Sequence, residues 1–225
     1  MLKLTLSFIC IAFFSTFLKA QEQNNKWTIS LGPAFISDPY PRFGIQPGVV
    51  YKPGKNLGIL TELTVTPKMS TDPSYSNNQY LRIKSELRYI FSQKKSGREN
   101  YYYGLQLSYS YRKWNDLGGG AYFQKEDYYD SSYSYSSATI TSPVITASLQ
   151  MGYCLFPGKH FGIEIFGGAG IRGVVTEYSN IENKVKGPYY RPICKIFPSP
   201  DPAWWMNETS WRFHANLGFR FQYRF

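Results

Sequence analysis

Residues 211–225 read WRFHANLGFRFQYRF, and this segment carries the clearest signal of the fold. Large apolar side chains stand at alternate positions, and the positions between them hold mostly charged, polar or glycine residues. Because successive side chains of a β-strand point to opposite faces, this period predicts a long strand with one apolar face. The apolar face comprises Trp211, Phe213, Leu217, Phe219, Phe221, Tyr223 and Phe225, and the other face Arg212, His214, Asn216, Gly218, Arg220, Gln222 and Arg224.

The same two-residue period recurs in seven earlier segments, which clusters of Gly, Pro, Asn, Asp and Ser separate. These segments span residues 27–35, 43–51, 57–66, 81–91, 101–111, 145–155 and 161–172. With the final stretch they make eight predicted strands, most of which have about 10 residues, the length that crosses a bilayer as a tilted strand.

The connections between these strands alternate in length. At one end lie two tight Pro-Gly turns and a moderate one, at 53–56, 157–160 and 92–100. At the other end lie three long connections and one short one, at 67–79, 113–138, 179–209 and 37–41. Short turns at one end and long loops at the other are typical of transmembrane β-barrels. We predict an all-β, eight-stranded, antiparallel up-and-down transmembrane barrel.

Composition limits the class of protein further. The 225-residue chain is 43% hydrophobic, 18% aromatic and 18% charged, with a formal net charge of +10. A charged share below the average of about 25% argues against disorder, a long coiled coil or a nucleic-acid-binding tail. The mean hydropathy of −0.36 argues against a helical membrane protein. We therefore expect no nucleic-acid partner.

The first twenty residues have the layout of a secretory signal peptide. A short basic start ends at Lys3, residues 4–18 are almost unbroken apolar sequence, and Ala20 precedes a polar stretch. A membrane anchor is the alternative, but an apolar run of about 15 residues is shorter than the ~20 that span a bilayer. We predict that residues 1–20 are a signal peptide and that residues 21–225 form one barrel domain.

Alternation alone leaves open which way the apolar face points. A soluble, lipocalin-like barrel turns that face inward around a ligand, whereas a membrane barrel turns it toward lipid. Aromatic residues stand near the ends of the apolar faces, as in the interfacial girdles of membrane barrels. The other face holds Gly, Ser, Thr, Gln and opposed charges, which suits a packed lumen. We predict the membrane orientation.

The final seven residues, FRFQYRF, are similar to the C-terminal signature of outer-membrane barrels. In that family the barrel-insertion machinery recognises this segment, so the resemblance implies an insertion signal at Phe219, Phe221, Tyr223 and Phe225. The mature chain resembles the small eight-stranded OmpX and OmpA-transmembrane-like proteins, including outer-membrane β-barrel domain proteins of Bacteroidota. The resemblance implies a protein of a Gram-negative outer membrane, in contact with its lipid and lipopolysaccharide.

The polar face predicts a charged lumen. The predicted lumen set is Glu62, Arg82, Lys84, Glu86, Arg88, Glu164, Arg172, Arg212, Arg220 and Arg224. An eight-stranded barrel is just wide enough for its own side chains, and isolated buried charge is costly, so these groups must be paired or hydrated. Three carboxylates against seven cations leave some arginines to reach water, loops or an anion. We favour a plug of salt bridges over a narrow anion-favouring path.

Few residues are suited to catalysis. Residues 168–173 spell G-x-G-x-x-G, but residues 174–176 are β-branched and continue a strand where a dinucleotide site needs a helix. His160 falls in a predicted turn. Some outer-membrane lipid A deacylases and acyltransferases resemble this scaffold and pair a His with a Ser. Here His214 and Ser210 stand about 13 Å apart along one strand, too far for a direct hydrogen bond. A Ser from another strand remains open, but we predict no catalytic, cofactor or metal site.

Two long connections, 113–138 and 179–209, are the candidate sites for a protein partner. Residues 122–135 in the first are rich in Tyr and Ser, which is typical of binding loops but equally of a solvated extension of the neighbouring strands. The second contains candidate contacts to lipopolysaccharide phosphates and to the outer interface, although a solvated loop explains them equally well. These candidates are Lys184, Lys186, Arg191, Lys195, Trp204 and Trp205.

The two cysteines that remain after export are predicted to be free. Cys154 lies beside the 157–160 turn, and Cys194 lies in the last long connection at the opposite end. About 25 Å of membrane or more separates these ends, whereas a disulfide needs Cα atoms within about 7 Å.

The sequence therefore favours a structural role or recognition through surface loops, without a cofactor. Three alternatives stay open: a lipid-modifying enzyme, an accessory subunit of an envelope secretion or assembly complex, and a narrow pore.

Overall fold

The computed structural model describes residues 26–36, 42–66, 79–93, 99–123, 131–156, 159–186 and 209–225. The strands in these ranges are β1 (Trp27–Ile36), β2 (Arg42–Tyr51), β3 (Leu57–Val65), β4 (Gln79–Gln93), β5 (Glu99–Phe123), β6 (Ser131–Thr141), β7 (Val144–Leu155), β8 (Phe161–Val175), β9 (Glu177–Glu182), β10 (Val185–Lys186) and β11 (Thr209–Arg224). Within the same ranges, no helix has the length and hydropathy needed to cross a membrane.

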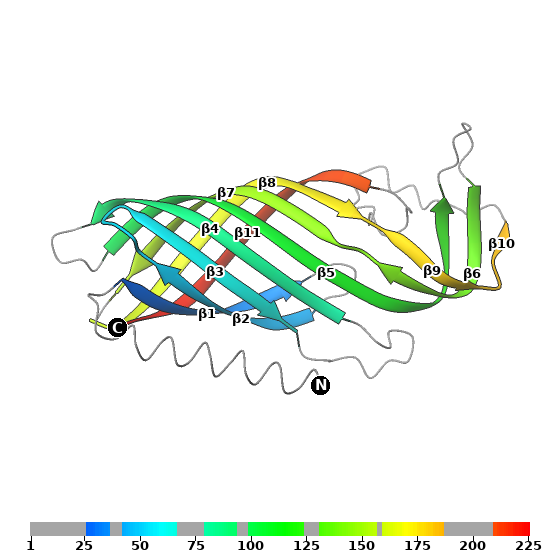
Figure 1. Ribbon diagram of the computed structural model, residues 1–225, viewed down its shortest axis with the longest axis horizontal. Helices are drawn as coiled ribbons and strands as arrows, with labels where there is room; N and C mark the ends of the chain where they lie inside the picture. Colours follow the sequence, from blue (N-terminus) through cyan, green and yellow to red (C-terminus); the bar gives the residue numbers. More distant parts are fainter. Residues whose placement is uncertain are drawn as a thin grey trace.

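Eight of these strands close into an antiparallel barrel (Figure 1). The order around the wall is β1, β2, β3, β4, β5, β7, β8 and β11, and every neighbouring pair is antiparallel. The barrel closes because β11 returns beside β1, where Thr28 lies opposite Arg224 and Leu31 lies opposite Phe221. The predicted all-β, eight-stranded up-and-down architecture is confirmed.

The outer surface of the barrel is apolar along almost all of its strands. Leu217, Phe213 and Trp211 on β11 are 84%, 73% and 68% exposed, and similar rows of exposed Leu, Ile, Phe and Tyr follow the other strands. The residues between them point inward, so that exposed and buried residues alternate without a break along β3. Compared with a water-soluble barrel, the two faces are inverted.

Aromatic rings fill part of the lumen, and two of them lie directly against glycines. Tyr102 on β5 is opposite Gly152 on β7, and Phe166 on β8 is opposite Gly218 on β11. A Cβ atom on Gly152 would lie 2.3 Å from the Tyr102 ring, and one on Gly218 would lie 2.5 Å from the Phe166 ring. The glycines are therefore needed at these positions because a ring occupies the space of a side chain.

On one side, β5 continues past the barrel into a smaller sheet (Figure 1). The end of β5 from residue 113 onward pairs with β6, which pairs along its other edge with β9 and β10. We call this four-stranded structure the extension sheet. Tyr135 and Ala138 on β6 pack against Tyr178 and Ile181 of β9, and the Tyr135 hydroxyl donates a hydrogen bond of 2.7 Å to Asp116.

The extension sheet corrects the prediction that 113–138 and 179–209 are simple loops. Strand β5 runs through residue 123, β6 begins at residue 131, β9 occupies residues 177–182 and β10 residues 185–186. The sequence did not predict these strands, because a sheet that is partly exposed to solvent on both faces needs no apolar residue at every second position. The Tyr- and Ser-rich segment thus includes strand residues, which favours the interpretation as an extension of neighbouring strands.

Several predicted features lie outside the described residues, namely residues 1–20, most of the 179–209 connection, Arg191, Cys194, Lys195, Trp204 and Trp205. Cys154 is described, and it is a free, buried thiol as predicted.

Candidate functional site

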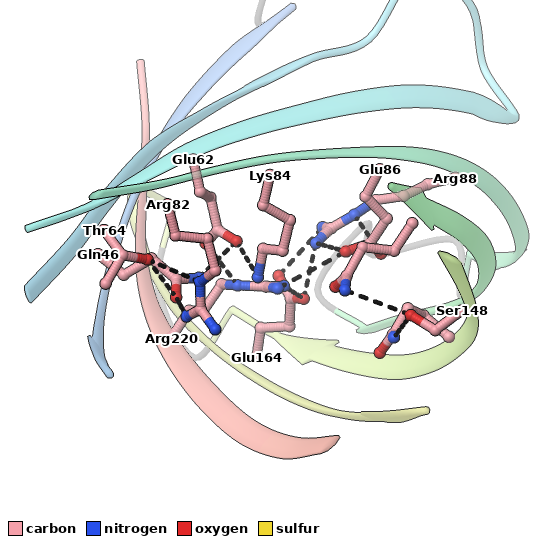
Figure 2. Close-up of polar contacts among 12 residues, drawn as sticks. Gln46, Glu62, Thr64, Arg82, Lys84, Glu86, Arg88, Ser148, Glu164 and Arg220 are labelled. Carbon is pink, nitrogen blue, oxygen red and sulfur yellow. Dashed lines mark hydrogen bonds and ion pairs between the residues drawn. The ribbon is translucent and has the colours of Figure 1, made fainter. Parts of the chain in front are cut away.

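Six charged side chains from four strands meet inside the barrel (Figure 2). This ionic cluster consists of Glu62 on β3, Lys84, Glu86 and Arg88 on β4, Glu164 on β8 and Arg220 on β11. All six are buried. Their side chains point inward because each residue occupies a polar position in a strand of alternating polar and apolar residues. Closure of the barrel then brings these strands, which are distant in the sequence, to face one another across the lumen.

Arg220 occupies the centre of the ionic cluster and contacts all three carboxylates. Its Nε lies 2.7 Å from Glu62 Oε1 and its Nη2 lies 3.6 Å from Glu86 Oε2. Its Nη1 also pairs with Glu164. A guanidinium presents its donors in a rigid planar fork, so one side chain can join carboxylates from three strands.

Arg88 and Lys84 complete the charge balance. Arg88 lies 2.9 Å from Glu164 and 3.0 Å from Glu86, and Lys84 pairs with Glu62. Three cations thus face three carboxylates, and the ionic cluster is formally neutral. Each ion has partners of opposite sign in place of water, so removal of one member would leave an unpaired buried charge.

Neutral polar side chains also donate hydrogen bonds to two carboxylates of the ionic cluster. The Tyr102 hydroxyl and the Gln222 amide donate to Glu164, and Gln46 Nε2 donates to Glu62 Oε2 at 2.6 Å. The sequence-derived site contained charged residues alone and did not include these three. The sequence did contain a signal for them, because the two-residue alternation places each of these side chains on the inward face of its strand.

Aromatic rings cover the cations of the ionic cluster. The Arg220 guanidinium carbon lies 3.7 Å from the centre of the Phe166 ring, and Lys84 Nζ lies 5.3 Å from the same ring. The guanidinium carbon of Arg88 lies 4.3 Å from the centre of the Tyr102 ring. A cation over a ring face is attracted by the quadrupole of the ring, more strongly when both are dry.

The other four predicted lumen cations lie outside the ionic cluster. Arg172 on β8 and Arg212 on β11 are directly opposite each other toward the loop end of their strands, and Arg82 stands near the loop end of β4. Arg224 lies at the other end of β11, where its guanidinium carbon is 3.9 Å from the centre of the Phe156 ring. The structure therefore divides the predicted set into a neutral centre and separate cationic groups.

Sequence reasoning missed Arg112, which is buried on the inward face of β5. Its Nε donates to the Ser142 carbonyl at 2.9 Å and its Nη2 to the Ser142 hydroxyl at 2.7 Å. The predicted strand ended at residue 111, just before Arg112, whereas β5 continues to Phe123. The alternation nevertheless places residue 112 on the inward face.

The candidate catalytic groups do not form a site in the described part of the chain. The G-x-G-x-x-G stretch at 168–173 lies within β8, and no helix opens there. His160 Nδ1 lies 2.9 Å from the backbone oxygen of Arg224. His214 is half-buried on β11, and the Ser210 side chain lies outside the described atoms. No described group of three or more His, Cys, Asp or Glu side chains is placed to hold a metal ion.

Comparison with solved structures finds distant likenesses over most of the chain. A major outer membrane protein of Thermus thermophilus is 13% identical over 90% of this chain and 100% of its own, with a TM-score of 0.42. CarO of Acinetobacter baumannii is 12% identical over 90% of this chain and 98% of its own, with a TM-score of 0.38. No family model and no curated protein matches the sequence. Likenesses this distant carry no argument about function.

Proposed function

We propose that this protein is a monomeric, integral β-barrel of a Gram-negative outer membrane, and that the extension sheet is a recognition surface held outside the membrane. The observation that carries the proposal is the inversion of the two faces. Large apolar side chains cover the outside of the wall, while six ionised groups are buried inside it. Water would disfavour such an exterior, whereas hydrocarbon favours it and a closed barrel satisfies the backbone.

Strand length and aromatic placement support the membrane location. Strands β7 and β8 have 12 and 15 residues, enough to cross the hydrocarbon at a tilt. Aromatic rings gather near the short-turn end of the wall, as in an interfacial girdle. The pairs there are Trp27 with Tyr51, Tyr101 with Tyr153 and Phe161 with Tyr223, with ring centres 4.5, 4.8 and 5.1 Å apart.

The proposal includes the route of export and assembly. Residues 1–20 are removed as a signal peptide, and the barrel-assembly machinery recognises Phe219, Phe221, Tyr223 and Phe225. Of these, Phe219, Phe221 and Tyr223 are exposed on the outer face of β11. Lipid and lipopolysaccharide then surround the wall.

Impermeant thiol labelling of intact cells tests location and orientation together. In a Cys194→Ser background, Ser136→Cys places a thiol on the exposed part of β6, and Lys55→Cys places a matched thiol in the exposed 53–56 turn. We expect labelling only at position 136 in intact cells and at both positions after lysis. Labelling of both in intact cells, or recovery of the folded chain from a water-soluble fraction, would contradict the proposal.

Shortening of the extension sheet tests the recognition role. Leu117 and Ser137 are paired, so a two-residue turn can replace residues 118–136 without changing the barrel ladder. In pull-downs from native membranes we expect the full chain to retain a protein that the shortened chain loses, while both show the heat-dependent gel shift of folded barrels. Identical captured proteins would reject the recognition role, and a control chain with altered 53–56 residues should behave as the full chain does.

A further inference from the structure

The short-turn end of the barrel carries two half-buried cations on the inward side of its wall. Thr28 on β1 is paired with Val50 on β2 and with Arg224 on β11. Lys52 follows Val50 by two positions and therefore lies on the same inward side. Its backbone N–H donates to the Lys26 carbonyl at 2.8 Å, which holds Lys52 beside the same end of β1. We call Lys52 and Arg224 the cation pair.

The Phe156 ring supports the guanidinium of Arg224 from one side. The guanidinium carbon lies 3.9 Å from the centre of this ring, and Phe156 is buried. Gly162 on β8 leaves room for the ring, because a Cβ atom there would lie 2.6 Å from it. One face of the guanidinium thus rests on the ring, while its N–H donors lie along its edges. Within the described ranges, no protein group accepts a hydrogen bond from these donors.

The cation pair lacks a counter-ion in the described part of the chain. The described acidic groups at this end are Glu99 and the C-terminal carboxylate of Phe225, and neither forms an ion pair with Lys52 or Arg224. Glu164 is close enough to interact with the Lys52 charge, but it already belongs to the neutral ionic cluster. Burial, and then the neighbouring Arg224 charge, lower the pKa of Lys52. The two cations therefore repel each other, and an anion between them would relieve this repulsion.

The connections at this end of the barrel add to the positive charge. Residues 53–56, 92–100 and 157–160 hold one acidic residue, Glu99, and the basic residues Lys55, Lys94, Lys95, Arg98 and Lys159. An excess of one sign of charge around the mouth of a lumen raises the local concentration of ions of the opposite sign. These connections therefore favour the approach of an anion to the cation pair.

We propose that the cation pair binds a small oxyanion, a carboxylate or phosphate group, that reaches it from the short-turn end of the barrel. The guanidinium of Arg224 presents a planar fork that matches two oxygens of such a group, and the Lys52 ammonium supplies further donors. Half-buried contacts are screened less by salt than those of exposed lysines. In the proposed orientation this end faces the periplasm, so only the compartment of the ligand rests on the proposed function.

Titration of the folded, signal-free chain in a maltoside detergent with inorganic phosphate tests the inference. The side-chain Nε–H resonance of Arg224, assigned by its loss in Arg224→Gln, reports binding, and we expect its shift to saturate. Lys52→Gln should weaken binding by about 10-fold because it removes one charge-assisted contact. Lys52→Arg should largely restore binding. Lys55→Gln is the matched control in the neighbouring turn, where the lysine is exposed, and should change the affinity by less than about 2-fold.

The other outcomes of the experiment decide what the cation pair binds. A shift that does not saturate, or equal affinity of the native chain and Lys52→Gln, would overturn the inference. Equal weakening by Lys52→Gln and Lys55→Gln would also overturn it, because it would assign binding to the general charge of this end. Titration with acetate then identifies the source: affinity similar to that of phosphate supports a carboxylate ligand, and binding of phosphate alone supports a phosphate ligand.

Two precautions keep the result decisive. If Lys52→Gln does not show the heat-dependent gel shift of a folded barrel, Arg224→Gln replaces it with the same expected loss, followed through the backbone amide of Lys52. Failure of the membrane proposal would be seen separately, in the cell-labelling experiment, because this titration does not depend on where the protein lies in the cell.

Discussion

At the scale of single residues, Arg220 has the largest expected effect on stability. It contacts all three carboxylates of the ionic cluster, and its replacement leaves them facing only Lys84 and Arg88. We predict that Arg220→Gln lowers the free energy of unfolding by about 3–5 kcal/mol, the usual cost of leaving a buried charge unpaired. Urea unfolding of the barrel in lipid, followed by tryptophan fluorescence, measures this difference.

A matched arginine and a double variant serve as controls for Arg220. Arg224→Gln removes the same charge at the barrel end, where the side chain is half-exposed, and should cost far less. Arg220→Gln/Glu164→Gln removes one charge of each sign, so its loss should be smaller than the sum of the two single losses. Strict additivity would show that Arg220 and Glu164 do not act together.

Gly152 provides a second prediction at this scale. A Cβ atom there would overlap the Tyr102 ring, whereas one on Gly54 would meet nothing within 4 Å. We predict that Gly152→Ala destabilises the barrel by about 1–3 kcal/mol through overpacking, and that Gly54→Ala is nearly neutral. Comparison of urea midpoints for the two variants checks this, and equal midpoints would contradict the packing argument.

Single residues also show how much of the lumen's composition the two-residue alternation predicts. The sequence placed Glu62, Glu164 and Arg220 on inward faces, which is a local property of each strand. It did not predict that these three would meet while Arg172 and Arg212 lie elsewhere. Their meeting depends on the register between strands that are more than 50 residues apart in the chain, and no local pattern encodes that register.

At the scale of elements, the extension sheet differs from the barrel in how it is held. Barrel strands are paired on both edges within a closed wall, whereas the extension sheet relies on its own ladder and a small cluster around Tyr135. Asp116 lies within this sheet, outside the proposed membrane-spanning wall. Burial raises the pKa of Asp116, and the hydrogen bond from Tyr135 only partly opposes that change.

We predict that the extension sheet becomes more stable as the pH falls. A carboxyl group with a raised pKa in the folded state is more easily protonated there than in the unfolded chain, so folding is favoured as the pH approaches the folded pKa from above. Amide exchange of β6, corrected for intrinsic rates, should therefore slow between pH 7 and pH 5. In Asp116→Asn the corrected rates should be slow at both pH values; the same pH trend in this variant would assign it to another group.

At the scale of the whole molecule, the ionic cluster and its aromatic rings predict a closed lumen. Glu86, Glu164 and Arg220 have no contact with water, and Phe166 packs against the same group. We predict that the protein gives no steady conductance in planar bilayers. Arg220→Ser/Phe166→Ser removes two large side chains from the plug and should produce measurable current, whereas Arg224→Ser should not. A steady current from the native chain would instead support the pore alternative.

Local patterns in the chain were enough to establish the fold class, because a two-residue period over eight segments specifies strands, and turn residues specify where they end. They also established which side chains share a face, since that property needs only neighbours along the chain. Two features emerged only from the folded barrel: which charges neutralise one another, and that two predicted loops contain a second sheet. These features depend on contacts between segments far apart in sequence, whose geometry is fixed only when the barrel closes.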